Sequence, residues 1–191
     1  MKKVFLIPMI LAMGLSVLAQ EEDELQTLFG RSTKVRGFFG PTLELTTLSG
    51  EFSAMLGAGG GILLDDFFLG GYGVGLTNNS VMQEEIEFGY GGLLVGYSFL
   101  ANKPVHPGVS VLLGLGTVTS PDSFFEDDNV WVITPTIEME VNLARFMKAS
   151  IGATYRFVGG ISDSGAEQQG YSNQDFSGPA GIISLRFGWF D

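Results

Sequence analysis

Alternation between apolar and polar residues is clearest in three stretches in the second half of the chain. The clearest covers 130–143, where one set of alternate positions holds Trp131, Ile133, Pro135, Ile137, Met139, Val141 and Leu143. The positions between them hold Thr134, Thr136, Glu138, Glu140 and Asn142. Residues 147–160 and 178–190 alternate in the same way. Because successive side chains of a β-strand point to opposite sides, this pattern predicts strands with one apolar and one polar face.

Five further stretches have strand character, and turn-forming residues separate all of them. The eight predicted strands are 34–48, 52–64, 67–77, 84–100, 107–118, 130–143, 147–160 and 178–190. A tilted strand needs about 9–11 residues to cross the hydrocarbon of a bilayer, and most of these stretches are long enough. An even number of strands would place both termini of the chain on the same side of the membrane, the periplasm.

The overall composition decides between a membrane barrel and a soluble one. A hydrophobic fraction of 45% and a mean hydropathy of +0.27 are high for a soluble domain, yet no stretch after Val17 is long enough for a spanning helix. Only helices and closed barrels satisfy all backbone groups inside lipid. We therefore predict an all-β fold, an eight-stranded antiparallel up-and-down transmembrane barrel. The alternative is a soluble periplasmic lipocalin-like barrel that binds a hydrophobic ligand with inward apolar faces; a charged fraction of only 16% disfavours it.

The first residues have the order of a secretory signal peptide. Lys2 and Lys3 precede an apolar run to Val17, and Val17-Leu18-Ala19 supplies small or modest side chains before an acidic segment. The predicted division is a cleavable signal peptide at 1–19, a short acidic periplasmic segment at 20–33 and the barrel at 34–191. No cysteine is present, so no disulfide is expected. The net charge of −11 excludes nucleic acid as a partner.

The predicted connections differ in length between the two ends of the barrel. Three are short, at Leu64–Phe67, Ala101–His106 and Ala144–Phe146, and three are longer, at Asn78–Gln83, Ser120–Asn129 and Ile161–Ser177. The connection at Ser49-Gly50-Glu51 is a tight turn that departs from this rule. Short periplasmic turns and longer external loops are typical of outer-membrane barrels.

The signal peptide, the eight-strand layout and the closing strand, Ile182 to Phe190, together resemble the small outer-membrane barrels typified by the OmpA transmembrane domain and OmpX. Here Asp191 follows the aromatic residue that ends the closing strand. The resemblance implies a monomer in the bacterial outer membrane, in contact with membrane lipid and lipopolysaccharide, with its last strand read by the barrel assembly machinery. It implies no cofactor and a structural or surface-interaction role for the outer loops.

Turning the polar faces inward places seven charged residues in the lumen: Arg36, Glu44, Glu138, Glu140, Lys148, Arg156 and Arg186. Buried charges are costly unless they are paired, so we expect a structural network of ion pairs. Arg156 should lie near Glu44, and Arg186 near both Glu138 and Glu140. The glycines Gly57, Gly59, Gly71 and Gly73 should make room opposite. Side chains fill such a narrow lumen, which disfavours the alternative of a narrow small-solute transporter or pore.

The sequence also bears on catalysis and on metal binding. His106, the sequence's one histidine, is expected in a periplasmic turn next to Lys103 and Pro104, and without a cysteine or a second histidine no enzyme is predicted. Glu126, Asp127 and Asp128 concentrate carboxylates in one predicted outer loop and form a candidate divalent-ion loop. Their spacing matches no known calcium loop, and ordinary hydration is the alternative.

Overall fold

The computed structural model describes residues 34–77, 87–119, 128–161 and 171–190. They form eight strands and one short helix: β1 (Val35–Leu48), β2 (Glu51–Leu64), β3 (Phe67–Leu76), β4 (Glu87–Ser98), β5 (Val105–Thr119), β6 (Asp128–Ala144), β7 (Met147–Gly159), α2 (Asn173–Phe176) and β8 (Gly178–Gly188). The predicted signal peptide and the acidic segment 20–33 lie outside the described residues.

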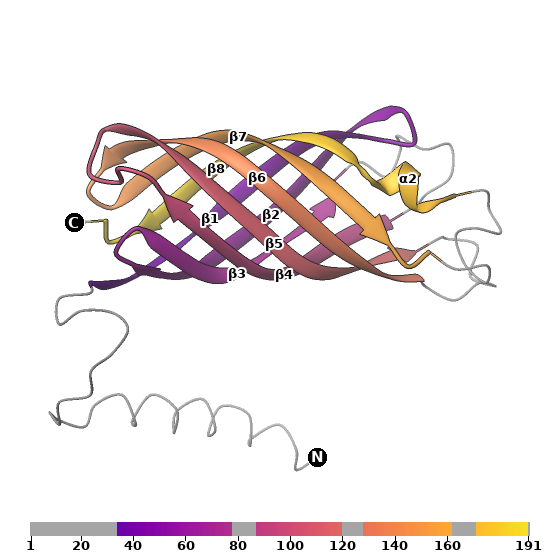
Figure 1. Cartoon of the computed structure of the whole chain (residues 1–191). Coiled ribbons are helices and arrows are strands. Elements are labelled where there is room, and N and C mark those ends of the chain that lie inside the picture. The colour runs from indigo at the N-terminus through magenta and orange to yellow at the C-terminus, as the bar shows by residue number, and fades with distance from the viewer. Residues whose placement is uncertain (1–33, 78–86, 120–127, 162–170, 191) are drawn as a thin grey trace, which may run out of the picture. The chain divides into compact units, whose positions relative to one another are not determined.

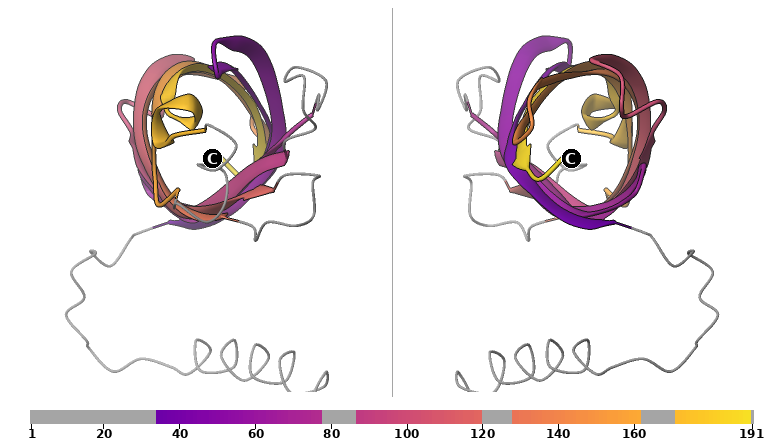
Figure 2. Two further views of the ribbon diagram at one scale, coloured as in Figure 1. Left: turned by 90° about the vertical axis from the view of Figure 1, so that its right-hand side faces the viewer. Right: turned by 90° about the vertical axis from the view of Figure 1, so that its left-hand side faces the viewer.

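The eight strands form one closed antiparallel barrel in sequence order, and β8 pairs with β1 to complete it (Figures 1 and 2). The closing ladder runs from Phe38 opposite Gly188 to Thr46 opposite Ala180. All backbone-bonded neighbours are antiparallel, as the alternation and the connection lengths indicate. The predicted fold class is therefore confirmed. Among the described residues, no helix is both long and apolar enough to span a membrane.

The two ends of the barrel differ in their connections. Strand β1 begins and β8 ends at one end, which we call the terminal end, and the opposite end, where α2 lies, is called the loop end (Figure 1). The turn between β1 and β2 at the loop end has two residues, Ser49 and Gly50, with φ angles of 48° and 83°. Two successive positive φ angles match the twist of a two-residue hairpin, which explains how this connection stays short.

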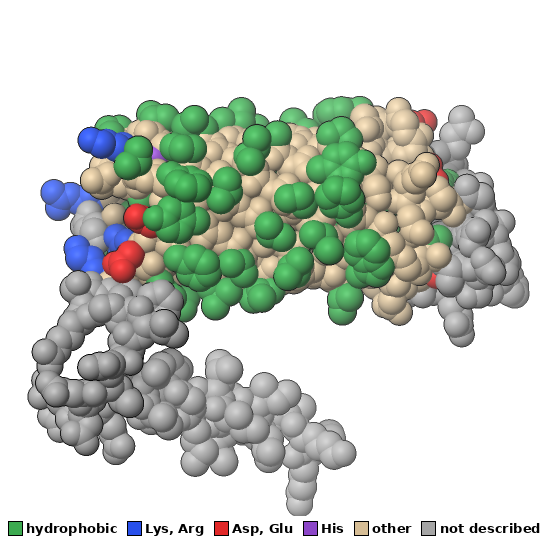
Figure 3. Space-filling view, viewed as in Figure 1, with side chains coloured by type: hydrophobic (Ala, Val, Ile, Leu, Met, Phe, Trp, Pro, Cys, Tyr) green, Lys and Arg blue, Asp and Glu red, His purple; other side chains and the backbone are tan. Residues whose placement is uncertain are grey.

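Large apolar side chains cover the outside of the barrel. Along β6 the exposed and buried residues alternate, so that Trp131 and Ile137 face outward while Val132 and Glu138 face the lumen. Ile137 is 66% exposed and Leu115 is 73% exposed. The face in Figure 3 carries a wide band of hydrophobic side chains around the middle of the barrel, with charged groups near its ends. The alternative of a soluble barrel with its apolar faces turned inward is therefore wrong.

The glycine-rich strands β2 and β3 lie unusually close to their neighbours. A Cβ atom added to Gly57 would lie 1.9 Å from the carbonyl oxygen of Gly73, and one added to Gly92 would lie 2.2 Å from that of Leu113. Glycine is therefore needed where this wall bends. Gly71 faces outward, as does Gly73 two residues along the same strand, so the expectation that these two make room in the lumen is wrong. Tyr72 between them lines the interior instead.

The predicted strand boundaries agree with the structure to within a few residues. Strands β5 and β6 each begin two residues earlier than expected, at Val105 and Asp128, and the predicted start of the fourth strand at 84 falls outside the described residues. The short helix α2 was not predicted. Its capping box, in which Ser172 and Asp175 satisfy each other's hydrogen bonds, fixes a single helical turn between β7 and β8.

Candidate functional site: two ionic clusters in the lumen

The first cluster, called the loop-end cluster, centres on the guanidinium of Arg156. This side chain comes from β7, is fully buried, and forms a hydrogen-bonded ion pair with Glu44 of β1. Its Nε donates to the carbonyl oxygen of Phe176 at 2.7 Å, and its second terminal nitrogen donates to the hydroxyl of Thr46 at 3.3 Å. The hydroxyl of Tyr90 donates to the other carboxylate oxygen of Glu44 at 2.6 Å. Both charges are thus desolvated and hydrogen-bonded.

Aromatic rings complete the surroundings of Arg156. The guanidinium carbon lies 5.4 Å from the ring centre of Phe88 and 5.7 Å from that of Tyr90. Both rings come from β4, on the opposite side of the lumen from the strand that carries Glu44. A cation within about 6 Å of an aromatic face gains electrostatic stabilisation, so these rings fix Arg156 in the middle of the lumen.

The second cluster, called the terminal-end cluster, is organised around two carboxylates of β6. Arg186 of β8 pairs with Glu140 and, at 2.6 Å, with Glu138. Glu140 also lies 3.5 Å from the ammonium of Lys148 and 2.7 Å from Nε2 of His106. Two carboxylates therefore face a guanidinium and an ammonium group within one buried cluster.

Further polar and aromatic groups close the terminal-end cluster. The hydroxyl of Ser98 donates to Glu140 at 3.0 Å, and the guanidinium of Arg186 lies 5.1 Å from the ring centre of Phe68. The ammonium of Lys148 lies 4.9 Å from the ring centre of Phe190, so this aromatic side chain covers the cluster at the terminal end of the lumen. Glu140 accepts hydrogen bonds from more groups than Glu138 does, which makes it the centre of this cluster.

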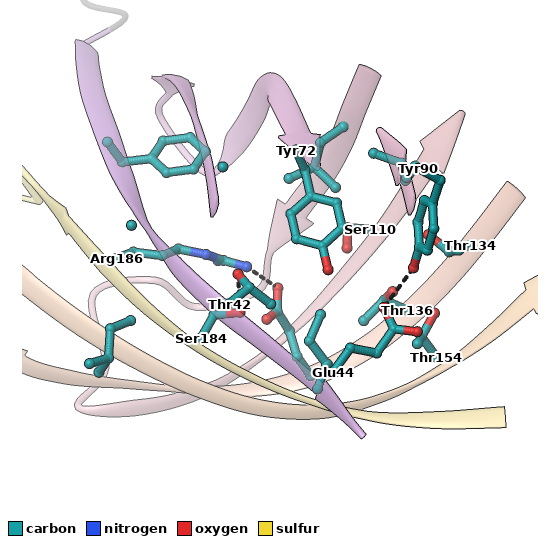
Figure 4. Close-up of a pocket in the computed structure, with 18 residues that line it drawn as sticks. Thr42, Glu44, Tyr72, Tyr90, Ser110, Thr134, Thr136, Thr154, Ser184 and Arg186 are labelled. Carbon is teal, nitrogen blue, oxygen red and sulfur yellow. Dashed lines mark hydrogen bonds and ion pairs between the residues drawn. The ribbon is translucent and has the colours of Figure 1, made fainter. Parts of the chain in front are cut away.

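A small polar chamber of about 40 Å³ separates the two clusters. Figure 4 shows hydroxyl-bearing side chains from several strands around it, with Glu44 and Arg186 also in its lining. The hydroxyl of Tyr72 is buried there without a hydrogen-bond partner in the described part of the chain, and those of Thr42 and Ser184 bond each other at 3.1 Å. A space of this size has room for water molecules, since about 10–15 Å³ suffices for one.

Between the chamber and the loop end, the lumen is apolar. The prediction that polar faces point inward did not include such a layer. One cluster of buried hydrophobic side chains fills it: Leu48, Met55, Val74, Phe88, Tyr90, Leu112, Val118, Val130, Val132, Val158 and Phe176. Strand β6, for example, turns Val130 and Val132 inward between the buried polar residues Asp128 and Thr134. From the loop end to the terminal end, the described lumen contains an apolar layer, an ion pair, a chamber and a second ionic cluster.

The structure places six of the seven predicted charged residues in these two clusters. The seventh, Arg36, donates from its guanidinium to the backbone oxygen of Asp65 at the turn between β2 and β3, at 3.0 Å. In the candidate divalent-ion loop, Glu126 and Asp127 lie outside the described residues, and Asp128 is a buried residue at the start of β6. Within the described ranges, no group of three or more metal-ligating side chains is present.

Sequence reasoning missed several members of these clusters. His106 is not a turn residue but lies in β5, with its side chain fully buried against Glu140 and its Nδ1 next to the backbone oxygen of Lys103. The prolines around it suggested a turn, whereas the strand begins at Val105. Tyr90 and Ser98 could have been found from the same alternation, because each has the parity of the lumen-facing positions of β4.

A closed eight-stranded antiparallel barrel with an apolar exterior and paired charges inside has the architecture of the small outer-membrane barrels. Neisserial surface protein A (NspA) is one such solved structure: it matches with a TM-score of 0.60 and 10% identity, over 82% of this chain and 97% of that chain. Ail, the attachment invasion locus protein of Yersinia pestis, matches with a TM-score of 0.48, 12% identity and coverage of 83% and 99%. The outer membrane protein OprG from Pseudomonas aeruginosa matches with a TM-score of 0.48 and 11% identity, over 85% of this chain and 99% of that chain.

The first of these likenesses shows the fold that this chain shares with small eight-stranded outer-membrane barrels. No protein-family model and no curated protein sequence matches the chain.

Proposed function

We propose that this protein is an integral, monomeric outer-membrane β-barrel, exported with a cleavable signal peptide, whose closed lumen serves stability and whose loop end serves a structural or surface-interaction role. The observation that carries the proposal is the reversal of polarity across the wall. Charged side chains are paired inside, whereas exposed isoleucine, leucine, valine and aromatic residues cover the outside. In water this arrangement would leave an apolar surface far larger than soluble monomers expose.

Exposed aromatic residues near both ends of the wall support a membrane setting. Towards the loop end they are Phe52, Trp131, Tyr155 and Phe157, and towards the terminal end they are Phe39, Tyr97, Phe99, Phe146 and Trp189. Tyrosine and tryptophan favour the interface between lipid and water, and outer-membrane barrels carry such girdles on both sides of their apolar band. The exposed apolar surface between these two groups of aromatic residues is the part of the wall that acyl chains would cover.

Replacing Ile137 with arginine tests the membrane setting. Ile137 lies in the middle of β6 and faces outward. An arginine near the bilayer midplane is expected to destabilise the barrel folded in lipid by about 2–4 kcal/mol. The matched control is Thr47→Arg, at the loop end of β1, where the cost should be about 0–1 kcal/mol. Urea titration of the protein in phosphatidylcholine vesicles measures both. Equal, small losses for the two variants would contradict the proposal, because a hydrated wall tolerates arginine anywhere.

A second experiment tests the closed lumen. Among the described residues, two groups of ion pairs and a layer of buried apolar side chains lie across the interior, and this supports a closed lumen. We expect the purified protein in planar bilayers to show no steady single-channel conductance. Reproducible unitary steps would favour the alternative function of a narrow small-solute pore. The conductance of a variant with Arg156 replaced by methionine should be recorded in parallel, so that a leak from partial unfolding is recognised.

The acidic side chains at the loop end favour partners that tolerate negative charge. Its exposed charged side chains among the described residues include Glu51 and Glu87, and both are acidic. Contact with lipopolysaccharide would then need divalent ions to bridge its phosphates to carboxylates. The proposal also keeps β8 as the segment read by the barrel assembly machinery. It includes no catalytic activity, since His106 is buried among ion pairs at the terminal end.

A further inference from the structure

The short helix α2 is not part of the barrel wall. Strand β7 ends at Gly159, β8 begins at Gly178, and their ladder is already complete from Met147 opposite Phe187 to Arg156 opposite Gly178. Figure 2 shows α2 within the ring of strands at the loop end. A single helical turn has little stability of its own. Its position therefore depends on what it contacts inside the barrel.

The barrel wall supplies an apolar socket for one residue of this helix. Phe176 has no exposed surface, and its ring centre lies 5.1 Å from that of Phe88. The other side chains of its apolar cluster come from different strands, among them Leu48, Met55, Val74, Val130 and Val158. We call this set of wall residues the aromatic socket. All of these side chains belong to barrel strands and none belongs to α2.

One polar group at the base of the aromatic socket gives it directionality. The Nε of Arg156 donates to the backbone oxygen of Phe176 at 2.7 Å. Glu44 and Thr46 hold the rest of the guanidinium, so the Nε–H faces the occupant in a fixed direction. The occupant is therefore recognised by a flat ring and by an acceptor oxygen a few bonds away.

Among the described residues, the hydrogen bonds that hold α2 outside the aromatic socket include three at its rim. Asn173 accepts from the backbone N–H of Ile161 at 3.1 Å, and the backbone N–H of Ser49 donates to Asp175 at 3.0 Å. The Ser177 hydroxyl accepts from the backbone N–H of Val158 at 3.0 Å. Each such bond contributes little net free energy, which leaves Phe176 as the main anchor.

We propose that the loop end of the lumen is a binding site for small aromatic compounds that carry an acceptor oxygen, and that Phe176 occupies this site as an internal ligand. A molecule with a phenyl ring and a nearby carbonyl reproduces both contacts of Phe176. The proposal concerns the interior of the barrel and does not depend on its location, since the aromatic socket is the same in micelles and in lipid.

Phenylacetamide is a suitable probe, because it joins a phenyl ring to an amide oxygen and dissolves in water. The Phe176→Ala variant, refolded in detergent micelles, loses the main anchor of α2, so the backbone oxygen of residue 176 also leaves Arg156, and we expect saturable binding at least tenfold tighter than in the unsubstituted protein. Binding should shift the NMR resonance of the Arg156 Nε–H. Toluene, which has the ring but no acceptor, should bind this variant at least threefold more weakly than phenylacetamide does.

Phe190→Ala is the matched control, since Phe190 packs in the lumen at the opposite end, over Lys148. It should bind the probe no better than the unsubstituted protein. Equal binding by the two alanine variants, or binding that leaves the Arg156 resonance unmoved, would overturn the proposal.

Asn173→Ala keeps the aromatic socket intact and removes one rim bond of α2. It should bind phenylacetamide at least threefold more tightly than the unsubstituted protein. If Phe176→Ala does not fold, as judged by loss of heat-modifiable migration on a gel, this variant decides alone, and an unchanged affinity would refute the proposal.

Discussion

Replacing Arg156 with methionine is expected to lower the free energy of unfolding by about 3–5 kcal/mol, because the substitution leaves the carboxylate of Glu44 buried without its cation. Both side chains are almost completely inaccessible, and Tyr90 alone cannot neutralise the remaining charge. The loss should appear in a urea titration in micelles followed by the fluorescence of Trp131 and Trp189. A loss below about 1 kcal/mol, as for an exposed pair, would contradict the buried ion pair.

The control for this prediction removes both charges. In the double variant Glu44→Gln with Arg156→Met, the amide oxygen still accepts from Tyr90, and no unpaired charge is left. A buried ion pair exchanged for neutral groups of similar volume is often close to neutral in stability. The double variant should therefore recover about 2 kcal/mol relative to Arg156→Met. No recovery would indicate that the arginine acts through packing against Phe88 and Tyr90 instead.

Replacing Glu140 with leucine is expected to have an effect of similar size, about 3–5 kcal/mol, in the terminal-end cluster. Lys148 and Arg186 would then face each other with Glu138 as the remaining carboxylate nearby, and His106 and Ser98 would lose their shared partner. The same titration measures the loss. Because both cations are largely buried, salt should restore little of it.

Glu138→Leu is the matched control on the same strand and the same face. Glu138 pairs with Arg186, whereas Glu140 contacts four polar groups, so removal of Glu138 should cost less than that of Glu140 by about 1 kcal/mol or more. A cost for Glu138→Leu equal to or above that for Glu140→Leu would contradict the central position of Glu140.

The strands could be predicted from the sequence because their signal is local. Alternation with period two follows from strand geometry alone, and it located the ends of β6, β7 and β8 to within two residues. The prediction of the even strand number and of the turn at Ser49 and Gly50 needed only neighbouring residues. The helix α2 could not be predicted in this way, because four residues carry no periodic pattern and their fold depends on contacts with distant strands.

The lumen was less predictable than the wall. Placing the polar faces inward was enough to bring Arg156 to Glu44 and Arg186 to the two β6 carboxylates. The same rule gave no warning of the apolar layer at the loop end, where both faces of a strand are hydrophobic and periodicity cannot choose between them. Val130 and Val132 illustrate this limit, since they follow the parity of Glu138 but not its polarity.

The pairing of Glu44 with Arg156 also has a kinetic consequence. These residues are 112 positions apart, and β8 lies between the strands that carry them, so the pair forms only once the first strand has met the last. Until then both groups keep their hydration. Contacts of such long range form late, and late contacts affect how fast a protein unfolds far more than how fast it folds. The Glu44–Arg156 pair is thus expected to lengthen the lifetime of the closed state with little effect on the rate of reaching it.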